Sequence, residues 1–254
     1  MVPRLARICY GPVERVFGGV VLKSLPLPVL VAAAVAVVTL ATVLGRLIWV
    51  RGSPPPPLSP GRARGLATAA LIVEMNSGRH DLLGAGFRPD DARATLASAW
   101  RSRDRASVRR TLVWLENEGD RHRWEAMLQA FEEGDPQLED AALADGALRA
   151  ELEVINRFGQ LHPSLVAWDL CRAVALVRFA FAGEFLSETE SWQWVDRFGA
   201  MIRSSFSSWI EMADNYLVGR EFTSGPPDVD LKRAYVSLID PANSASPWNR
   251  IRWG

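Results

Sequence analysis

The stretch that decides the fold is residues 166–183, which read VAWDLCRAVALVRFAFAG. Its apolar residues recur every three or four positions, the spacing that places side chains on one face of an α-helix. Asp169 falls at the edge of this apolar stripe, Arg172 lies farther round the helix, and Arg178 lies on the opposite flank. The stripe that is predicted to face a core consists of Val166, Leu170, Ala173, Val174, Val177 and Phe181.

The same helical spacing continues through most of the chain after residue 64, with no strand-rich region and no internal repeat. About 190 residues are enough to bury one sizeable core. The predicted fold class is therefore all-α, as a single compact multi-helix domain over residues 64–254. Helices are expected over 64–77, 90–100, 103–117, 120–133, 137–158, 164–183, 188–203, 205–222 and 229–239.

Several of these helices carry recognisable start and stop signals. Ser102 is the expected N-cap of the helix over 103–117, and Gly119 is its expected end. Ser187 and Glu190 form an S-x-x-E capping box at the start of the helix expected over 188–203.

The region before the helical domain has a different character. Residues 29–50 read VLVAAAVAVVTLATVLGRLIWV, and Arg46 is the only charge among them. A helix of this length reaches about 33 Å, enough to cross a ~30 Å hydrocarbon core. We therefore predict one transmembrane helix over 29–50, in contact with membrane lipid. Residues 1–28 form a basic N-terminal segment, either a short amphipathic helix or a disordered tail, and 51–63 form a proline-rich linker.

The charges follow this division of the chain. Residues 1–64 carry eight Lys/Arg and one acid, a balance of +7, whereas the remainder carries 21 Lys/Arg and 28 acids, a balance of −7. Non-specific binding to phosphates needs a positive surface, so nucleic acid is not expected as a partner. The domain does contain one basic run, formed by Arg101, Arg103, Arg105, Arg109 and Arg110.

The helix over 205–222 places a charge on an apolar stripe. Continuing the spacing of its apolar residues brings Arg220 to the face that is expected to pack on the core. A buried arginine needs a carboxylate or several carbonyls as partners. Asp169 is the preferred partner on this reasoning, and Glu184 is the second choice.

An ordered set of residues points to a family. It comprises Trp168, Asp169, Arg172 and Arg178, then Phe206, Ser208 and Trp209, and then Tyr216, Gly219 and Arg220. This order resembles the DUF1266 family of bacterial proteins over roughly residues 95–225. Two positions depart from the family pattern: Asp120 stands where the pattern has a histidine, and Thr223 stands near the place of a tryptophan. The resemblance implies a fold and a set of marked positions, and the family name assigns no reaction.

These residues divide into two candidate groups. The candidate polar cluster consists of Asp169, Arg172, Arg178 and Arg220. The candidate packing residues are Trp168, Trp209, Tyr216 and Gly219. The cluster fits either a buried network that fixes how helices dock or a site in which arginines hold an anion beside an acid–base carboxylate. No catalytic residue can be assigned, and no metal or cofactor is expected.

Two functions follow from these readings. The first is a membrane-anchored helical interaction or regulatory module with no evident catalytic centre, which binds a protein partner. The alternative is an enzyme or small-anion receptor that uses the Asp/Arg cluster. Basic residues flank residues 29–50 on both sides, so the positive-inside rule does not choose an orientation. Unpaired cysteines and the family resemblance favour the cytoplasmic side for the domain.

Overall fold

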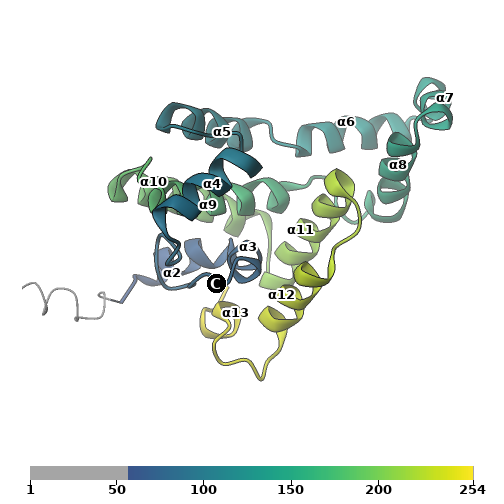
Figure 1. The fold of residues 1–254 in the computed structure, drawn as a ribbon. Helices are drawn as coiled ribbons and strands as arrows, with labels where there is room; N and C mark the ends of the chain where they lie inside the picture. Colours follow the sequence, from purple (N-terminus) through teal and green to yellow (C-terminus); the bar gives the residue numbers. More distant parts are fainter. Residues whose placement is uncertain (1–56, 254) are drawn as a thin grey trace, which may run out of the picture. The chain divides into compact units, whose positions relative to one another are not determined.

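The computed structural model describes residues 57–253, and this part of the chain contains helices, turns and loops without a β-strand. The predicted all-α fold class is confirmed for these residues. Figure 1 shows the helices α2 (Pro60–Ala67), α3 (Ala70–Met75), α4 (Pro89–Ala99), α5 (Arg105–Asn117), α6 (Arg121–Glu132), α7 (Pro136–Ala144), α8 (Gly146–Phe158), α9 (Val166–Ala182), α10 (Glu188–Ser205), α11 (Trp209–Ser224), α12 (Val229–Ile239) and α13 (Pro247–Arg250).

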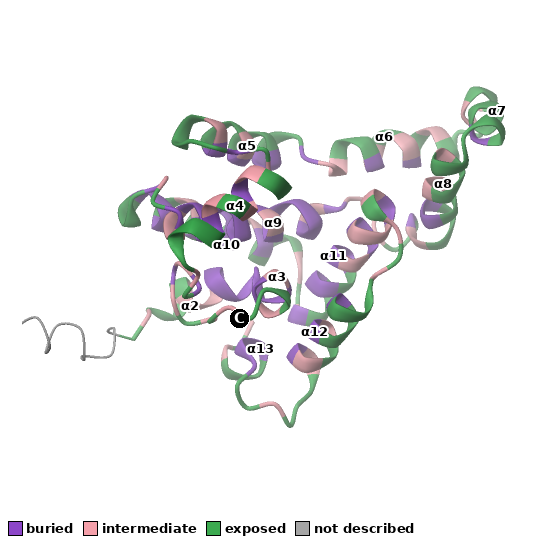
Figure 2. Cartoon of the chain, viewed as in Figure 1, coloured by how far each residue is buried: buried purple, intermediate pink, exposed green. Residues whose placement is uncertain are grey.

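Helix α9 is the centre of the fold. It packs against α4, α5, α10 and α11, and 13 of its 17 residues are buried (Figure 2). A helix that is covered on all sides needs apolar residues beyond a single stripe, and the alanine-rich composition of α9 supplies them. The single core-facing stripe predicted from the sequence was therefore too narrow. The flank that carries Arg178 is buried as completely as the stripe itself.

Two predicted helices are each broken in the structure. The helix predicted over 64–77 becomes α2 and α3, because the chain turns at Thr68, where the amide of Ala69 donates to the carbonyl of Leu66 at 3.2 Å. The helix predicted over 137–158 becomes α7 and α8. Asp145 has an extended backbone there, and its carboxylate accepts hydrogen bonds from the first amides of α8, which starts a new helix.

The caps agree in part with the sequence. Asp104, not Ser102, caps α5, through a 2.7 Å hydrogen bond from the amide of Ser107. The prediction for Ser102 was wrong because its buried hydroxyl donates to the carbonyl of Trp100 instead. Ser187 does cap α10, but the carboxylate of Glu190 turns away to the arginines of α5, so the box is only half formed.

The C-terminal segment folds back onto the domain. The indole of Trp248 donates to the carbonyl of Ala67 in α2 at 3.0 Å, and the indole of Trp253 donates to the carbonyl of Phe206 at 3.0 Å. Both rings contact Trp209, with ring centroids 6.0 and 4.6 Å apart. Trp209 is thus a packing residue that joins α11 to the tail.

The predicted membrane segment lies outside the described residues, as do the basic segment 1–28 and residues 51–56 of the linker. Among the helices from α2 to α13, none combines the length and apolar character needed to cross a membrane. Helix α2 begins at Pro60 with Ser59 as its cap, so the last four residues of the linker stretch are helical.

Candidate functional site

The site begins at a tight turn between α5 and α6. Gly119 has a φ of +65°, and its amide donates to the carbonyl of Trp114, which closes the end of α5. A Cβ atom at this position would lie 2.0 Å from Oδ2 of Asp169. Glycine is therefore required twice, for the left-handed backbone and for the close approach of a carboxylate from α9.

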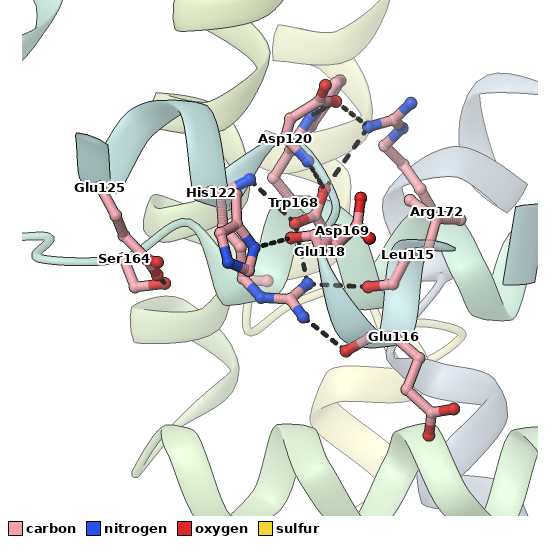
Figure 3. A network of polar contacts seen from close by, with 12 residues as sticks. Leu115, Glu116, Glu118, Asp120, His122, Glu125, Ser164, Trp168, Asp169 and Arg172 are labelled. Carbon is pink, nitrogen blue, oxygen red and sulfur yellow. Dashed lines mark hydrogen bonds and ion pairs between the residues drawn. The ribbon is translucent and has the colours of Figure 1, made fainter. Parts of the chain in front are cut away.

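Asp169 caps α6 from a distant helix. Its carboxylate accepts hydrogen bonds from the backbone amides of Asp120 (2.9 Å) and Arg121 (3.1 Å) (Figure 3). These amides are at the start of α6, where unpaired N–H groups and the helix dipole both favour a negative charge. No side chain of α6 itself caps this end. The carboxylate from α9 therefore fixes where α6 begins.

Arg121 completes the link between α5 and α6. Its guanidinium contacts Oδ2 of Asp169 at 3.0 Å and donates to the carbonyls of Leu115 and Glu116 in the last turn of α5. A single arginine therefore joins the carbonyl end of α5 to the carboxylate that holds the amide end of α6. Arg121 was not among the candidate residues predicted from the sequence, although its position two residues after Gly119 marks the start of a helix.

A second layer of contacts lies nearer the surface. The carboxylate of Asp120 accepts from Nε1 of Trp168 at 2.9 Å and from Nη1 of Arg172 (Figure 3). The guanidinium of Arg172 stacks over the rings of Trp168 and Trp100, 4.5 and 5.3 Å from their centroids. Asp120, at the position where the family pattern has histidine, thus pairs with the arginine of W-D-x-x-R. Arg172 also lies 3.7 Å from Asp169, so the structure brings these two candidates together.

Two opposing effects act on the charge of the buried Asp169 carboxyl. Burial raises the pKa of this carboxyl, while the amides of Asp120 and Arg121 and the charge of Arg121 act in the opposite direction. The side chain has no exposed surface. Because protein donors occupy both oxygens, the carboxylate has no free path to a substrate proton, which an acid–base role requires.

Arg178 lies apart from Asp169 and has a different set of partners. It is fully buried, and its guanidinium donates to four backbone carbonyls rather than to a carboxylate. Burial lowers the pKa of Arg178 to about 9, which still leaves the group charged at neutral pH. The carbonyls belong to Leu66 in α2 and to Arg79, Leu82 and Leu83 in the loop after α3, at 2.5 to 3.3 Å.

The partners and the location of Arg220 differ from those predicted from the sequence. Its guanidinium donates to the carbonyl of Gly225 at 2.9 Å and lies 3.7 Å from the carboxylate of Asp228. The preferred partner, Asp169, is held by Arg121, and the second choice, Glu184, pairs with Arg93. The side chain is 21% exposed, so Arg220 follows the end of α11 instead of entering the core. The four predicted cluster residues therefore form one pair, Asp169 with Arg172, and two separate arginines.

Three of the four candidate packing residues, Trp168, Tyr216 and Gly219, meet where α9 crosses α11, whereas Trp209 packs against the C-terminal tail. A Cβ atom at Gly219 would lie 2.3 Å from the Cβ atom of Trp168, so only glycine permits this approach. The ring of Trp168 lies 5.1 Å from that of Tyr216, and burial raises the pKa of this tyrosine. Cys171 is buried nearby and is not a reactive thiolate, because burial also raises the pKa of its thiol.

Comparison with known proteins places the chain in a family. No curated protein and no solved structure matched it. No group of three or more potential metal ligands occurs in the part of the chain that the structure describes. Residues 95–253 match the family model described as "Protein of unknown function (DUF1266)", a longer region than the resemblance suggested, and the chain belongs to the DUF1266 family.

Proposed function

We propose that this protein is a membrane-anchored helical interaction module that binds a protein partner through the outer face of α5. The observation that carries this proposal is an aromatic and basic surface on that helix. Val113 is 46% exposed and Trp114 is 37% exposed, although both are large apolar residues. Together with Arg109, Arg110, Asn117 and Glu118 they line a shallow groove of about 350 Å³.

Such a surface has the composition of a binding face. Exposed aromatic residues flanked by arginines are enriched among the residues that contribute most to protein interfaces. Arg105 and Arg109 are held by Glu190 from α10, which fixes the direction of the helix face. Arg110 forms no ion pair with any carboxylate among residues 57–253. Its charge is thus available for an acidic group on a partner.

The surroundings of Asp169, Arg178 and Arg220 support this proposal over the alternative of an enzyme or small-anion receptor. An enzyme or anion receptor needs its charged groups to converge on an open pocket. Here Asp169 and Arg178 are sealed and bonded to backbone groups, and Arg220 lies apart from them. These contacts support a scaffold role for the polar residues and direct attention to the outer surface.

The membrane part of the proposal is supported by the apolar run over 29–50, and it can be tested by fractionation. The full chain should remain with membranes after alkaline carbonate extraction. The double substitution Val37→Asp and Val38→Asp places two charges in the middle of the run, and that variant should be released. Release of the unsubstituted chain by carbonate would refute the anchor.

The proposed cytoplasmic location of the helical unit needs its own test. Single cysteines introduced at Gly52 and at Ser24 in a Cys9→Ser background report on the two sides of the run. In intact cells an impermeant maleimide should label the Ser24→Cys variant and leave Gly52→Cys unlabelled until the cells are opened. The reverse pattern would place the helical unit on the other side of the membrane.

The binding face can be tested by photo-crosslinking in the cells that make the protein. A benzoylphenylalanine at position 113 of the full chain should give a discrete adduct with protein in the membrane fraction. The same group at Val236, which is 60% exposed on α12, is the matched control. The adduct should disappear when Arg110→Glu is added. Equal labelling from positions 113 and 236, or none from 113, would refute α5 as the binding face.

A further inference from the structure

The charges of the domain are unevenly placed along α5, α6 and α7. Residues 101–110 carry five arginines and one acid, whereas residues 132–153 carry eight acids and one arginine. In Figure 1, α5 and α6 follow one another along one side of the helical unit, and α7 lies beyond α6. Helix α6 has 12 residues, which is about 18 Å of helix between the basic and the acidic part.

Helix α7 is an exposed acidic helix. Among its nine residues only Ala142 is buried, and α8 is its main packing partner. Leu143 is 79% exposed, the largest exposed fraction among the large apolar residues of the described chain. Glu139 and Asp140 are exposed one turn away and form no ion pair with any basic side chain between residues 57 and 253. The helix therefore presents an exposed leucine beside two carboxylates that form no ion pair within residues 57–253.

These properties complement the outer face of α5. That face offers a shallow apolar groove at Val113 and Trp114 with the unpaired charge of Arg110 at its rim. An acidic helix with one projecting leucine is complementary to it in charge and offers an apolar side chain for the groove. The exposed faces of α5 and α7 are separated by the length of α6. They therefore have the properties of the two sides of one interface.

We infer that the partner is a second copy of this chain, with α7 of each copy docked on α5 of the other. Along the chain, α5 is basic, α6 is mixed and α7 is acidic. A two-fold rotation about an axis near α6 places α7 of each copy against α5 of the other, so it produces two identical contacts. Leu143 of each copy then covers Val113 and Trp114, and the carboxylates of α7 face Arg110. This inference rests on the proposed function, because it identifies the partner of the same α5 face.

The first experiment is disulfide trapping between two copies of the full chain in membranes. Both copies carry Cys9→Ser; one has Val113→Cys and a first tag, and the other has Leu143→Cys and a second tag. Mild oxidation should link the two tags, whereas either variant alone should give little dimer, because each position faces a different position on its partner. A pair made from Val236→Cys and Leu143→Cys is the control for random collision.

The second experiment exchanges charges. Arg110→Glu should lower the yield of the 113–143 crosslink about tenfold, because like charges then face each other. Pairing that copy with one that carries Glu139→Arg and Asp140→Arg should restore the yield. Arg233→Glu, at an arginine that is 73% exposed on α12, should leave the yield unchanged.

The outcomes separate the two proposals. If the 113–143 pair links no better than the control pair while position 113 photo-crosslinks to a different protein, self-association is wrong and the α5 binding face stands. If position 113 gives no protein adduct at all, the binding face fails, and the inference fails with it. A crosslink that Arg110→Glu does not weaken would also overturn the inference.

Discussion

Replacing Arg178 with methionine should destabilise the domain strongly, although the substitution removes a buried charge. Methionine keeps much of the apolar stem but donates no hydrogen bond. The guanidinium now serves four buried or partly buried carbonyls, three of them in the loop after α3. At the lower end of the cost of an unsatisfied buried group, about 1 kcal/mol each, their loss amounts to about 4 kcal/mol.

Part of this loss is offset. The buried charge itself is desolvated without a carboxylate partner, and methionine removes that cost. Loop carbonyls can also turn towards water. The expected net loss in the free energy of unfolding is therefore about 2–4 kcal/mol, which corresponds to a fall in Tm of about 5–15 °C for a domain of this size.

Chemical denaturation of the full chain, followed by tryptophan fluorescence, measures this loss. Arg233→Met is the matched control, because that side chain is 73% exposed and its replacement should change stability by less than about 0.5 kcal/mol. Hydrogen exchange should also speed up at the amides of Arg79 and Ala85, which close the loop beneath Arg178. An Arg178→Met protein as stable as the unsubstituted chain would show that the four carbonyl contacts contribute little, and the reasoning would be refuted.

Three further predictions concern stability. Gly219→Ala should lower the free energy of unfolding by about 2 kcal/mol, because the new Cβ atom overlaps Trp168. Gly61→Ala is the control and should be close to neutral, because no atom lies within 4 Å of its new Cβ atom. Thermal melts of the two variants measure the difference. Arg220→Ala should cost only about 1 kcal/mol in urea unfolding, because the main partner of this partly exposed side chain is one carbonyl, and a loss above about 3 kcal/mol would contradict this. Burial alone would raise the pKa of Glu190, but hydrogen bonds from two arginines of α5 lower it below its ordinary 4.5. Unfolding titrations should therefore show that the free energy of unfolding falls as the pH drops below 4.5. The substitution Glu190→Gln should flatten that fall.

Local sequence signals predicted the helices well because caps and apolar spacing act over a few residues. Gly119 ends α5 as its position suggested, and Ser187 begins α10. The breaks inside two predicted helices were missed for the same local reason. Asp145 carries an N-cap signal, but the apolar spacing runs on through it on both sides, and the stronger pattern hid the weaker one.

The polar cluster could be predicted only in part, because helical spacing gives the direction of a side chain and not its distant partner. It correctly brought Asp169 and Arg172 onto neighbouring positions of one helix. It could not foresee that Arg121 from α6 would reach Asp169 first, nor that a loop would supply carbonyls to Arg178. Nothing local distinguishes an arginine on the outer flank of a surface helix from one on a helix that is covered on every side.

The two buried charges of α9 have the same structural role. Asp169 accepts amides from the start of α6, and Arg178 donates to carbonyls from α2 and a loop. Each charge thus satisfies backbone groups at places where regular hydrogen bonding stops, which are the places that a central helix must hold by other means. Asp169 and Arg178 therefore hold together parts of the chain that regular hydrogen bonds do not join.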